Sequence, residues 1–502
     1  MPFRYVIIKT NLNISNYALE QINIRYPVNG DVTMISSSKN LNAVFELTKH
    51  TIKATTFSGF FIDGERERKP YEADGYLGQL SQYALNSDYS IARRTQLYLL
   101  NNPTWPLEWQ MHLIAMAKED YLRTKDIKYI SSIYTELKKR LFLEHIDMST
   151  GLLDANNLEL HHTKIKPIID WPPCERKGFS SSYIFDYKDY LELYARKFRK
   201  FLYDIYGCEK LAWASEISVY LQDMKMNKIT TNNFVNHAHM YNALRNMQFL
   251  AGEIENYTDR KNFTNIANIL KETLNNNFFD TKSGFYCDTA KCNKTSFHSN
   301  LFAMAFNIVP RDREHKVLDF IYNNKSRAST YSSYYLLKIF FTFNMNKEAL
   351  NFITKNDTRS WINMIRQNQA TNTMESWNTR VKPNLDYTHI WSAHPLYFII
   401  RNIIGIKEPT KDEIIIKPRF QNLSYMQGDI HISNGHMHYS YSQEKNTITY
   451  KINKDFNTKI KFVFMDTENI INIELNGNRI KDNYESLNIN ENNFIIKVQY
   501  KD

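Results

Sequence analysis

The hydrophobic pattern of this chain changes its period near residue 406, and no other feature constrains the fold as strongly. From about residue 40 to residue 404, apolar residues recur at the i, i+3, i+4 spacing of amphipathic helices. Beyond that point, short runs alternate apolar and polar residues, and Asn-Gly pairs suited to hairpin turns occur at 434–435 and 476–477. The sequence therefore predicts a helical domain over residues 39–405 and an antiparallel β-sandwich over residues 406–502.

Ten segments carry the helical spacing, and mostly short connections with occasional Gly or Pro separate them. The segments are 89–100, 110–122, 128–144, 183–206, 233–257, 266–277, 300–308, 313–323, 332–343 and 390–404. An all-helical architecture of this size is either an open solenoid or a closed α/α barrel. Because no solenoid repeat period recurs, we expect the closed barrel.

Residues 1–38 contain short β-type runs at 3–8 and 31–35. These runs are too few to form an independent β domain. They are either the end of a β domain or strands that pack on another part of the chain.

Composition narrows the choice of partners. The net charge is +10, but the basic clusters at 138–140 and 196–200 are short and lie in charge-mixed segments, so we predict no nucleic-acid partner. We see no signal peptide and no apolar run long enough to span a membrane. The chain is therefore expected to be soluble and cytoplasmic by default, or periplasmic or secreted if its native N-terminus lies upstream.

The four cysteines lack zinc-site spacing, which predicts free thiols, no metal site and no cofactor.

Residues 61–74 form the first chemically dense segment, with the sequence FIDGERERKPYEAD. Its carboxylates include Asp63, Glu67 and Asp74, and Arg66 lies among them. Clustered carboxylates raise one another's pKa and a nearby arginine lowers it, so neighbouring acids can hold different protonation states at one pH. A general acid beside an ionised neighbour requires that difference. A solvated charged loop is the alternative interpretation.

Residues 372–394 form the second dense segment, with the sequence NTMESWNTRVKPNLDYTHIWSAH. Glu375 and Asp386 lie there among aromatic residues that include Trp377 and His389. Aromatic rings stack on the apolar faces of sugars while carboxylates bind hydroxyls or transfer protons. The alternative is a loop that packs its aromatic residues inward.

Two shorter segments have the same character. Residues 102–109 contain Trp105 and Trp109, and residues 169–173 contain Asp170 and Trp171. Loop-borne tryptophans and acids at one end of a barrel are better site candidates than helix-borne ones. Ordinary packing is the alternative for each segment.

Taken in order, these motifs resemble glycoside hydrolase family 78, the α-L-rhamnosidases, over roughly residues 40–430. Residues 63–68 (DGERER) resemble the family's DGxxREx motif, and residues 71–74 stand where Trp-x-Gly-Asp is common, with Tyr71 in place of the tryptophan. Residues 169–171 (IDW) resemble the later DW element. Residues 374–377 (MESW), followed by His389, resemble the C-terminal catalytic segment.

The resemblance implies a fold and a reaction. It implies an (α/α)6 barrel followed by a C-terminal β-sandwich, with residues 1–38 as the remnant of an N-terminal β domain. It also implies hydrolysis of α-L-rhamnosides with inversion, with Glu67 as general acid and Glu375 as general base. Inversion requires the two carboxyl groups to lie about 6.5–9.5 Å apart, which leaves room for a water molecule.

The resemblance also suggests which residues bind the substrate, a rhamnose-containing glycan or glycoside. Asp63, Arg66 and Asp74 match residues that hold the rhamnose, and Trp171 and His389 match further contacts. The loops add four more candidates, namely Trp105, Trp109, Asp170 and Trp377. A glycosidase for another sugar and a non-catalytic carbohydrate-binding protein remain alternatives, and the sequence predicts no oligomeric state.

Overall fold

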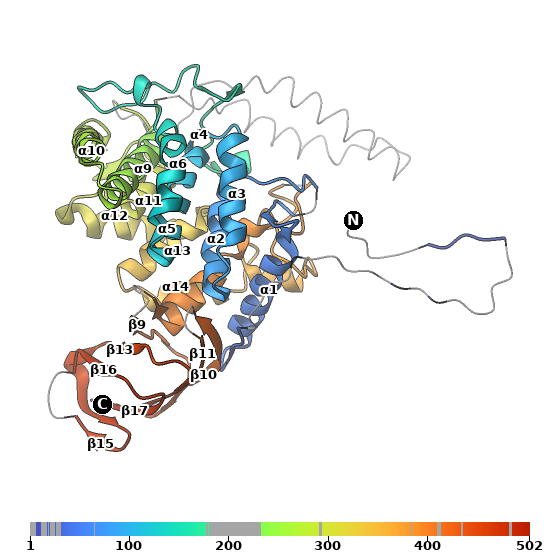
Figure 1. Cartoon of the computed structure of the whole chain (residues 1–502), viewed down its shortest axis with the longest axis vertical. Helices are drawn as coiled ribbons and strands as arrows, with labels where there is room; N and C mark the ends of the chain where they lie inside the picture. The colour runs from blue at the N-terminus through green and yellow to red at the C-terminus, as the bar shows by residue number, and fades with distance from the viewer. Residues whose placement is uncertain are drawn as a thin grey trace.

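The computed structural model shows a helical domain joined end to end with a β domain (Figure 1). It describes residues 7–11, 18, 20, 26, 32–64, 66–176, 179, 232–290, 294–382, 384–408, 413–432, 435–480 and 484–501. The helix predicted over 183–206 and residues 3–6 of the predicted N-terminal strand lie outside the described residues.

Six inner helical segments surround the centre of the described part of the helical domain. They are α2 (Glu72–Leu85), α5 (His112–Thr124), α9 (Phe234–Glu253), α11 (Phe297–Ala305), α13 (Ser333–Thr342) and α16 (Pro395–Phe398), which continues as the π-helical η5 (Ile399–Ile404). Helix α2 contacts α5, α5 contacts α9, α9 contacts α11, α11 contacts α13, and α16 contacts α2. Every residue of α2 and α11 is buried, as expected of helices that are surrounded on all sides.

Outer helices cover this inner ring, one against each inner helix. They are α1 (Lys39–Thr55), α3 (Ser90–Asn101), α6 (Ile127–Lys139), α10 (Tyr257–Asn277), α12 (Arg311–Asn323) and α14 (Asn346–Thr354). The buried residues of each outer helix fall on one face. Helix α1 contacts α16, α3 contacts α2, α6 contacts α5, α10 contacts α9, α12 contacts α11, and α14 contacts α13. This inner and outer pairing confirms the predicted (α/α)6 barrel.

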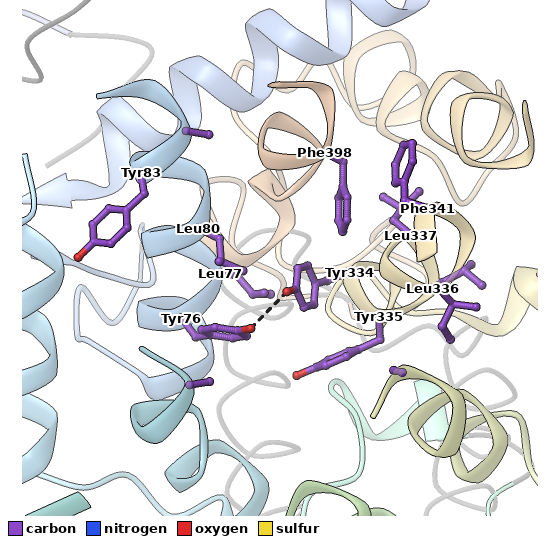
Figure 2. Packing of buried hydrophobic residues seen from close by; sticks show 14 of the residues in the cluster. Tyr76, Leu77, Leu80, Tyr83, Tyr334, Tyr335, Leu336, Leu337, Phe341 and Phe398 are labelled. Carbon is purple, nitrogen blue, oxygen red and sulfur yellow. Dashed lines mark hydrogen bonds between the residues drawn. The ribbon is translucent and has the colours of Figure 1, made fainter. Parts of the chain in front are cut away.

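Aromatic residues join the last inner helices to the first and so close the ring (Figure 2). The hydroxyl groups of Tyr76 on α2 and Tyr334 on α13 lie 3.2 Å apart. The ring of Phe398 on α16 lies 5.5 Å from both the Tyr334 ring and the Phe341 ring, and it stacks on the latter. Aromatic pairs at this spacing stabilise a fold beyond the area that they bury. The first and last thirds of the helical domain are therefore held together directly.

The C-terminal domain is a sandwich of two sheets. The larger sheet contains, in spatial order, β1 (Ile35–Ser36), β10 (Tyr425–Ile432), β11 (Gly435–Glu444), β12 (Thr447–Lys454), β17 (Asn493–Tyr500), β14 (Ile470–Leu475) and β15 (Asn478–Arg479). The smaller sheet contains β16 (Ser486–Ile489), β13 (Lys459–Val463), β9 (Glu413–Ile416) and β8 (Ile406–Lys407). Tyr450 of one sheet meets Phe462 of the other at 4.9 Å between ring centroids. The predicted sandwich is confirmed, although β9 and β13 pair in parallel rather than antiparallel fashion.

Strand β1 comes from the N-terminal part of the chain but lies at the edge of the C-terminal sheet. Ile35 pairs with Gln427 and Ser36 with Met426 in antiparallel register. Just before the strand, the Thr33 amide donates to the Asp429 carbonyl at 2.9 Å. Of the two interpretations of the N-terminal β-type residues, the described residues 32–36 therefore follow the second, in which they pack on another part of the chain.

Gly405 forms the junction between the two domains, where the sequence predicted the change of period. Its φ of 84° lies in the left-handed region, and a Cβ atom there would overlap the carbonyl of Lys417. The Lys417 amide donates to the Gly405 carbonyl at 2.9 Å, and the Arg419 amide donates to the Ile403 carbonyl at 2.8 Å. The first strands of the sandwich are thus bonded back onto the end of the last barrel helix.

Helix α2, like α1, α14 and α15 (Trp361–Arg366), is absent from the predicted helical segments. In the structure Glu72 and Asp74 occupy the first turn of α2. The helix escaped prediction because it is buried all round and therefore has no polar face to create a helical period.

Three further findings concern membrane spans, metal sites and cysteines. No described helix is long and apolar enough to cross a membrane. The described residues contain no group of three or more His, Cys, Asp or Glu side chains that could hold a metal ion. Cys287 is disulfide-bonded, so the expectation of free thiols is wrong for this residue.

We predict that Gly405→Ala destabilises the junction. The substitution strains a left-handed residue and forces a Cβ atom against the Lys417 backbone, so we expect a loss of about 2–4 kcal/mol in the free energy of unfolding. Gly477→Ala is a matched control, because Gly477 has a φ of 82° but no atom within 4 Å of the added Cβ. It should cost only about 1 kcal/mol. Equal losses in urea denaturation of the two variants would contradict the proposed role of the junction.

Candidate active site

The predicted site residues gather on loops at the N-terminal ends of the inner helices. The loop before α2, the segment around α4 (Leu107–Gln110), the loop before η2 (Pro173–Arg176) and the loop before η4 (Ile390–Ala393) carry nearly all of them. An antiparallel bridge between Asp63 and His389 joins the first loop to the last. Segments far apart in the sequence thus meet at one end of the barrel.

Gly64 allows the first loop to lie directly on the last. Its amide donates to the Thr388 carbonyl at 3.0 Å, and a Cβ atom at this position would overlap that same carbonyl. The glycine of the DG motif is therefore required for close backbone approach rather than for an unusual φ angle.

Glu375 occupies the best-defined carboxylate site. It is 3% exposed and accepts hydrogen bonds from Trp171 Nε1 at 2.9 Å, from the Asp386 amide at 3.1 Å, and from Lys382 Nζ at 2.6 and 2.5 Å. Burial alone would raise the pKa of this carboxyl, but the charges of Lys382 and His389 outweigh it and hold the pKa below its ordinary value. Glu375 is therefore ionised at neutral pH.

Asp63, Asp74 and His389 form a second buried cluster beside Glu375. His389 Nδ1 lies 3.1 Å from Asp74 Oδ1, and both side chains are at most 3% exposed. Burial opposes protonation of His389, but Asp74, Glu375 and Asp63 outweigh it and raise its pKa to about 9. Burial raises the pKa of Asp63 to about 7, although His389 opposes this shift. The cluster thus combines an imidazolium ion with a carboxyl that changes its protonation near neutrality.

Glu67 lies at the open side of the site, with 40% of its side chain exposed. Its Oε1 is 3.3 Å from Arg66 Nη2, and its Oε2 accepts a hydrogen bond from the Tyr71 hydroxyl. Arg66 Nε is also 3.6 Å from Asp386 Oδ1. Because the Asp386 amide binds Glu375, a short chain of contacts links the two predicted catalytic carboxylates through Arg66.

Aromatic side chains line the space around these acids. The Trp105 and Trp171 rings meet edge to face at 6.4 Å, and Trp109 meets Tyr71 at 6.1 Å and Trp391 at 5.7 Å. The buried Nε1 atom of Trp109 has no hydrogen-bond partner among the described residues. Trp171 and Trp391 each donate to an oxygen of Glu375, so the two groups of rings meet beside this residue. The predicted Trp105, Trp109 and Trp171 are together called the aromatic wall.

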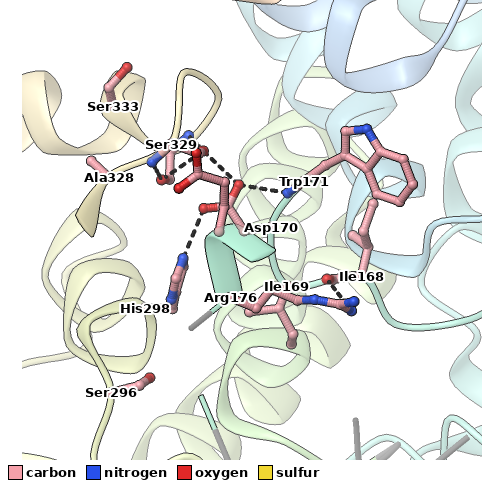
Figure 3. Close-up of polar contacts among 12 residues, drawn as sticks. Ile168, Ile169, Asp170, Trp171, Arg176, Ser296, His298, Ala328, Ser329 and Ser333 are labelled. Carbon is pink, nitrogen blue, oxygen red and sulfur yellow. Dashed lines mark hydrogen bonds and ion pairs between the residues drawn. The ribbon is translucent and has the colours of Figure 1, made fainter. Parts of the chain in front are cut away.

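Asp170 lies behind this wall, and protein groups bind both of its carboxylate oxygens (Figure 3). Oδ2 is bonded to His298 Nε2 at 2.8 Å, while Oδ1 accepts from Ser329 Oγ at 2.6 Å and from the Trp171 amide at 2.7 Å. Glu108 binds the two residues just before Asp170, because its carboxylate accepts hydrogen bonds from the amides of Ile168 and Ile169 at 2.8 and 2.9 Å. These two acids hold the loop that presents Trp171.

Trp377 is placed away from the open site. It is fully buried, donates from Nε1 to the Ala328 carbonyl at 2.8 Å, and packs edge to face on Trp361 at 5.0 Å. The residue supports the Glu375 segment from the core, and the structure does not bring it to the aromatic wall.

Three residues that shape the site were not among the predicted site residues: Lys382, Asp386 and Tyr71. The sequence had indicated Asp386 as a carboxylate of the second dense segment and Tyr71 as a replacement for tryptophan, but it assigned neither a role. Nothing in the local sequence indicates that Lys382 folds back onto Glu375, because that contact depends on the path of the loop between them.

The fold agrees with comparisons to known proteins. A family model described as the bacterial alpha-L-rhamnosidase 6 hairpin glycosidase domain matches residues 181–403. This part of the chain is therefore similar to the six-hairpin glycosidase domain of bacterial α-L-rhamnosidases. No curated protein matches the sequence.

Solved α-L-rhamnosidases share this fold at low sequence identity. The family 78 rhamnosidase of Bacillus sp. GL1 has a TM-score of 0.68 and 17% identity, with 88% of this chain and 43% of that chain covered. The Streptomyces avermitilis enzyme, solved with L-rhamnose, has a TM-score of 0.66 and 11% identity, with 94% and 42% covered. The Aspergillus terreus enzyme has a TM-score of 0.67 and 11% identity, with 93% and 50% covered. This rhamnosidase-like chain therefore spans half or less of each of these proteins.

We predict that Asp63 makes the protein less stable as the pH rises from about 4 to about 7. The ordinary pKa of this carboxyl is 3.8 and its folded pKa is about 7, so within this window the folded state retains a proton that the unfolded state has lost. The contribution to the free energy of unfolding falls by up to about 1.4 kcal/mol per pH unit. Asp63→Asn removes this contribution. Between pH 4.5 and 6.5, the free energy of unfolding of the variant should therefore fall less steeply with pH, by the amount that corresponds to about one bound proton. Parallel curves for the wild type and the variant would contradict this assignment.

Proposed function

We propose that this chain is an inverting α-L-rhamnosidase that releases terminal α-L-rhamnose from oligosaccharides, polysaccharides or glycosides. Glu67 serves as general acid and Glu375 as general base. The proposal rests above all on the unlike environments of these two carboxylates. Glu375 is buried and charge-paired with Lys382, whereas Glu67 lies at the open side of the site.

In the proposed reaction, Glu375 accepts a proton from a water molecule as that water attacks the anomeric carbon. Its lowered pKa keeps it ionised and ready for this role. Glu67 gives its proton to the departing glycosidic oxygen, and the bond between that oxygen and the anomeric carbon breaks. The carboxylate that remains on Glu67 is stabilised by Arg66 and the Tyr71 hydroxyl.

Substrate binding uses the remaining groups of the site. Asp63, Asp74 and His389 offer hydrogen-bond acceptors and donors to the hydroxyls of a single sugar ring. The wall formed by Trp105, Trp109 and Trp171 provides an apolar surface for the ring's C–H face. Rhamnose is the proposed sugar because the similar Streptomyces avermitilis protein was solved with L-rhamnose.

Tyr71 supports one alternative, in which the same scaffold cleaves a different sugar. It replaces the tryptophan common in the family, and its hydroxyl is bonded to Glu67 while its ring packs on Trp109. A polar group therefore stands beside the proposed acid where an indole is more usual. The second alternative is a carbohydrate-binding protein without catalysis.

We predict that Glu375→Gln and Glu67→Gln impair hydrolysis of p-nitrophenyl α-L-rhamnopyranoside to different extents. Loss of the base should lower kcat by about 10²–10⁴-fold. Loss of the acid should cost less on this substrate, because nitrophenolate departs with little protonation, and more on a rhamnoside with an alkyl alcohol leaving group. Glu272→Gln, at an exposed position on α10, is the matched control and should keep full activity. Proton NMR of the first turnovers should show the β-anomer.

Other outcomes of this experiment separate the alternatives. Activity on another p-nitrophenyl glycoside, with none on the rhamnoside, would overturn the substrate assignment and leave the site assignment standing. A folded protein that is inactive on every glycoside but binds L-rhamnose would favour the non-catalytic alternative. An α-anomeric first product would contradict inversion.

A second prediction concerns Lys382. Its ammonium group keeps the pKa of the buried Glu375 low, so Lys382→Met should move the acidic limb of the kcat profile to higher pH by about one unit or more. The sign follows because activity is lost as the pH falls through the pKa of the base, and that pKa rises without the lysine. Lys382→Arg retains the charge and should show a smaller shift. A lower kcat with an unmoved acidic limb would indicate that Lys382 only supports the loop.

A further inference from the structure

A cavity lies among the inner helices, apart from the loops that carry the catalytic candidates. Its volume is about 90 Å³, and helices α2, α5, α9 and α13 supply most of its lining. By this measure a water molecule needs roughly 10–15 Å³, so the cavity has room for several waters or for one small polyatomic ion. Tyr76 and Tyr335, both labelled in Figure 2, lie on its wall.

A layer of bonded aromatic residues separates this cavity from the proposed glycosidase site. His112 Nε2 lies 2.9 Å from the Tyr335 hydroxyl and 3.1 Å from the Tyr331 hydroxyl. The Tyr331 ring packs on Trp109 and Trp391 at centroid distances of 6.1 and 5.9 Å. One face of this layer thus meets the aromatic wall of the site, while His112 and Tyr335 line the cavity on the other.

The lining of the cavity is rich in hydrogen-bond donors. The polar and charged residues that line it include Lys118, Lys338, Glu119, His239, Asn242 and Asn246. Two lysines against one glutamate leave a formal charge of +1. Lys118 Nζ donates to Asn246 Oδ1 at 3.0 Å, which orients that side chain. His239 is 3% exposed, and its Nε2 has no partner among the described residues.

Lys338 is the least compensated of these groups. Among the described residues it has no ion pair and no hydrogen bond, and its ammonium lies 5.5 Å from the centroid of the Phe306 ring. Burial lowers its pKa to about 8, Glu119 opposes this shift and Lys118 adds to it. Lys338 is partly buried and shares its one nearby carboxylate, Glu119, with Lys118. A bound anion would reduce the cost of holding two ammonium groups beside one carboxylate.

We propose that this cavity is a binding site for a small oxyanion of the sulfate or phosphate class, held by Lys338, Lys118 and the neighbouring amide and imidazole groups. The excess of donors and the formal charge of +1 favour an anion over a cation. The volume suits an inorganic ion or a single terminal phosphate group. The site is separate from the carboxylates of the proposed reaction, so the proposal does not depend on glycosidase activity.

Calorimetric titration with sodium sulfate tests the proposal, with sodium chloride at equal ionic strength as the reference. We expect saturable binding of sulfate to the wild-type chain and a matching rise in its melting temperature. Lys338→Met should weaken sulfate binding at least about tenfold, because it removes the principal charge. Lys347→Met removes the same charge from an exposed position on α14 and should bind sulfate as the wild type does.

Glu119→Gln provides an independent variant should Lys338→Met fail to fold. It removes the cavity's acid, so sulfate should bind several-fold more tightly. Non-saturable behaviour in the wild type, unchanged affinity in Lys338→Met, or unchanged or weaker affinity in Glu119→Gln would each overturn the proposal.

Discussion

The buried ion pair between Glu375 and Lys382 is the interaction on which the rest of the site depends. A carboxylate at 3% exposure is stable only if its charge is paired and its oxygens are hydrogen-bonded. Lys382 supplies the charge, and Trp171 and the Asp386 amide supply further donors. Because these donors come from two loops, the position of the aromatic wall and that of the base are set together.

The acids around the site divide into two kinds. Asp170 and Glu108 accept hydrogen bonds from backbone amides and side chains of the protein, and their role is to hold loops. Asp63 instead has a pKa raised by burial to about 7, and Glu67 lies at the open side of the site. The environment of an acid thus decides whether it supports a loop or can change its protonation near neutral pH.

Much of the fold could be predicted because helical and strand periods are local properties. The predicted segments at 89–100, 313–323 and 332–343 lie within two residues of α3, α12 and α13 at both ends. Helix α2 was missed because complete burial removes the polar face that creates a helical period. The parallel pairing of β9 with β13 was missed for a related reason, since strand alternation reveals a face but not a neighbour.

The sequence by itself predicted a helical region followed by a β-sandwich, and it showed which acids stand in the two dense segments. Only the tertiary structure decided what each acid can do. A pKa depends on burial and on charges within a few ångströms, and those charges come both from the same loop, as with Lys382, and from residues hundreds of positions away, as with His389 on Asp63. His389 acts on Asp63, and Trp171 on Glu375, only because the barrel closes and brings its loops together at one end.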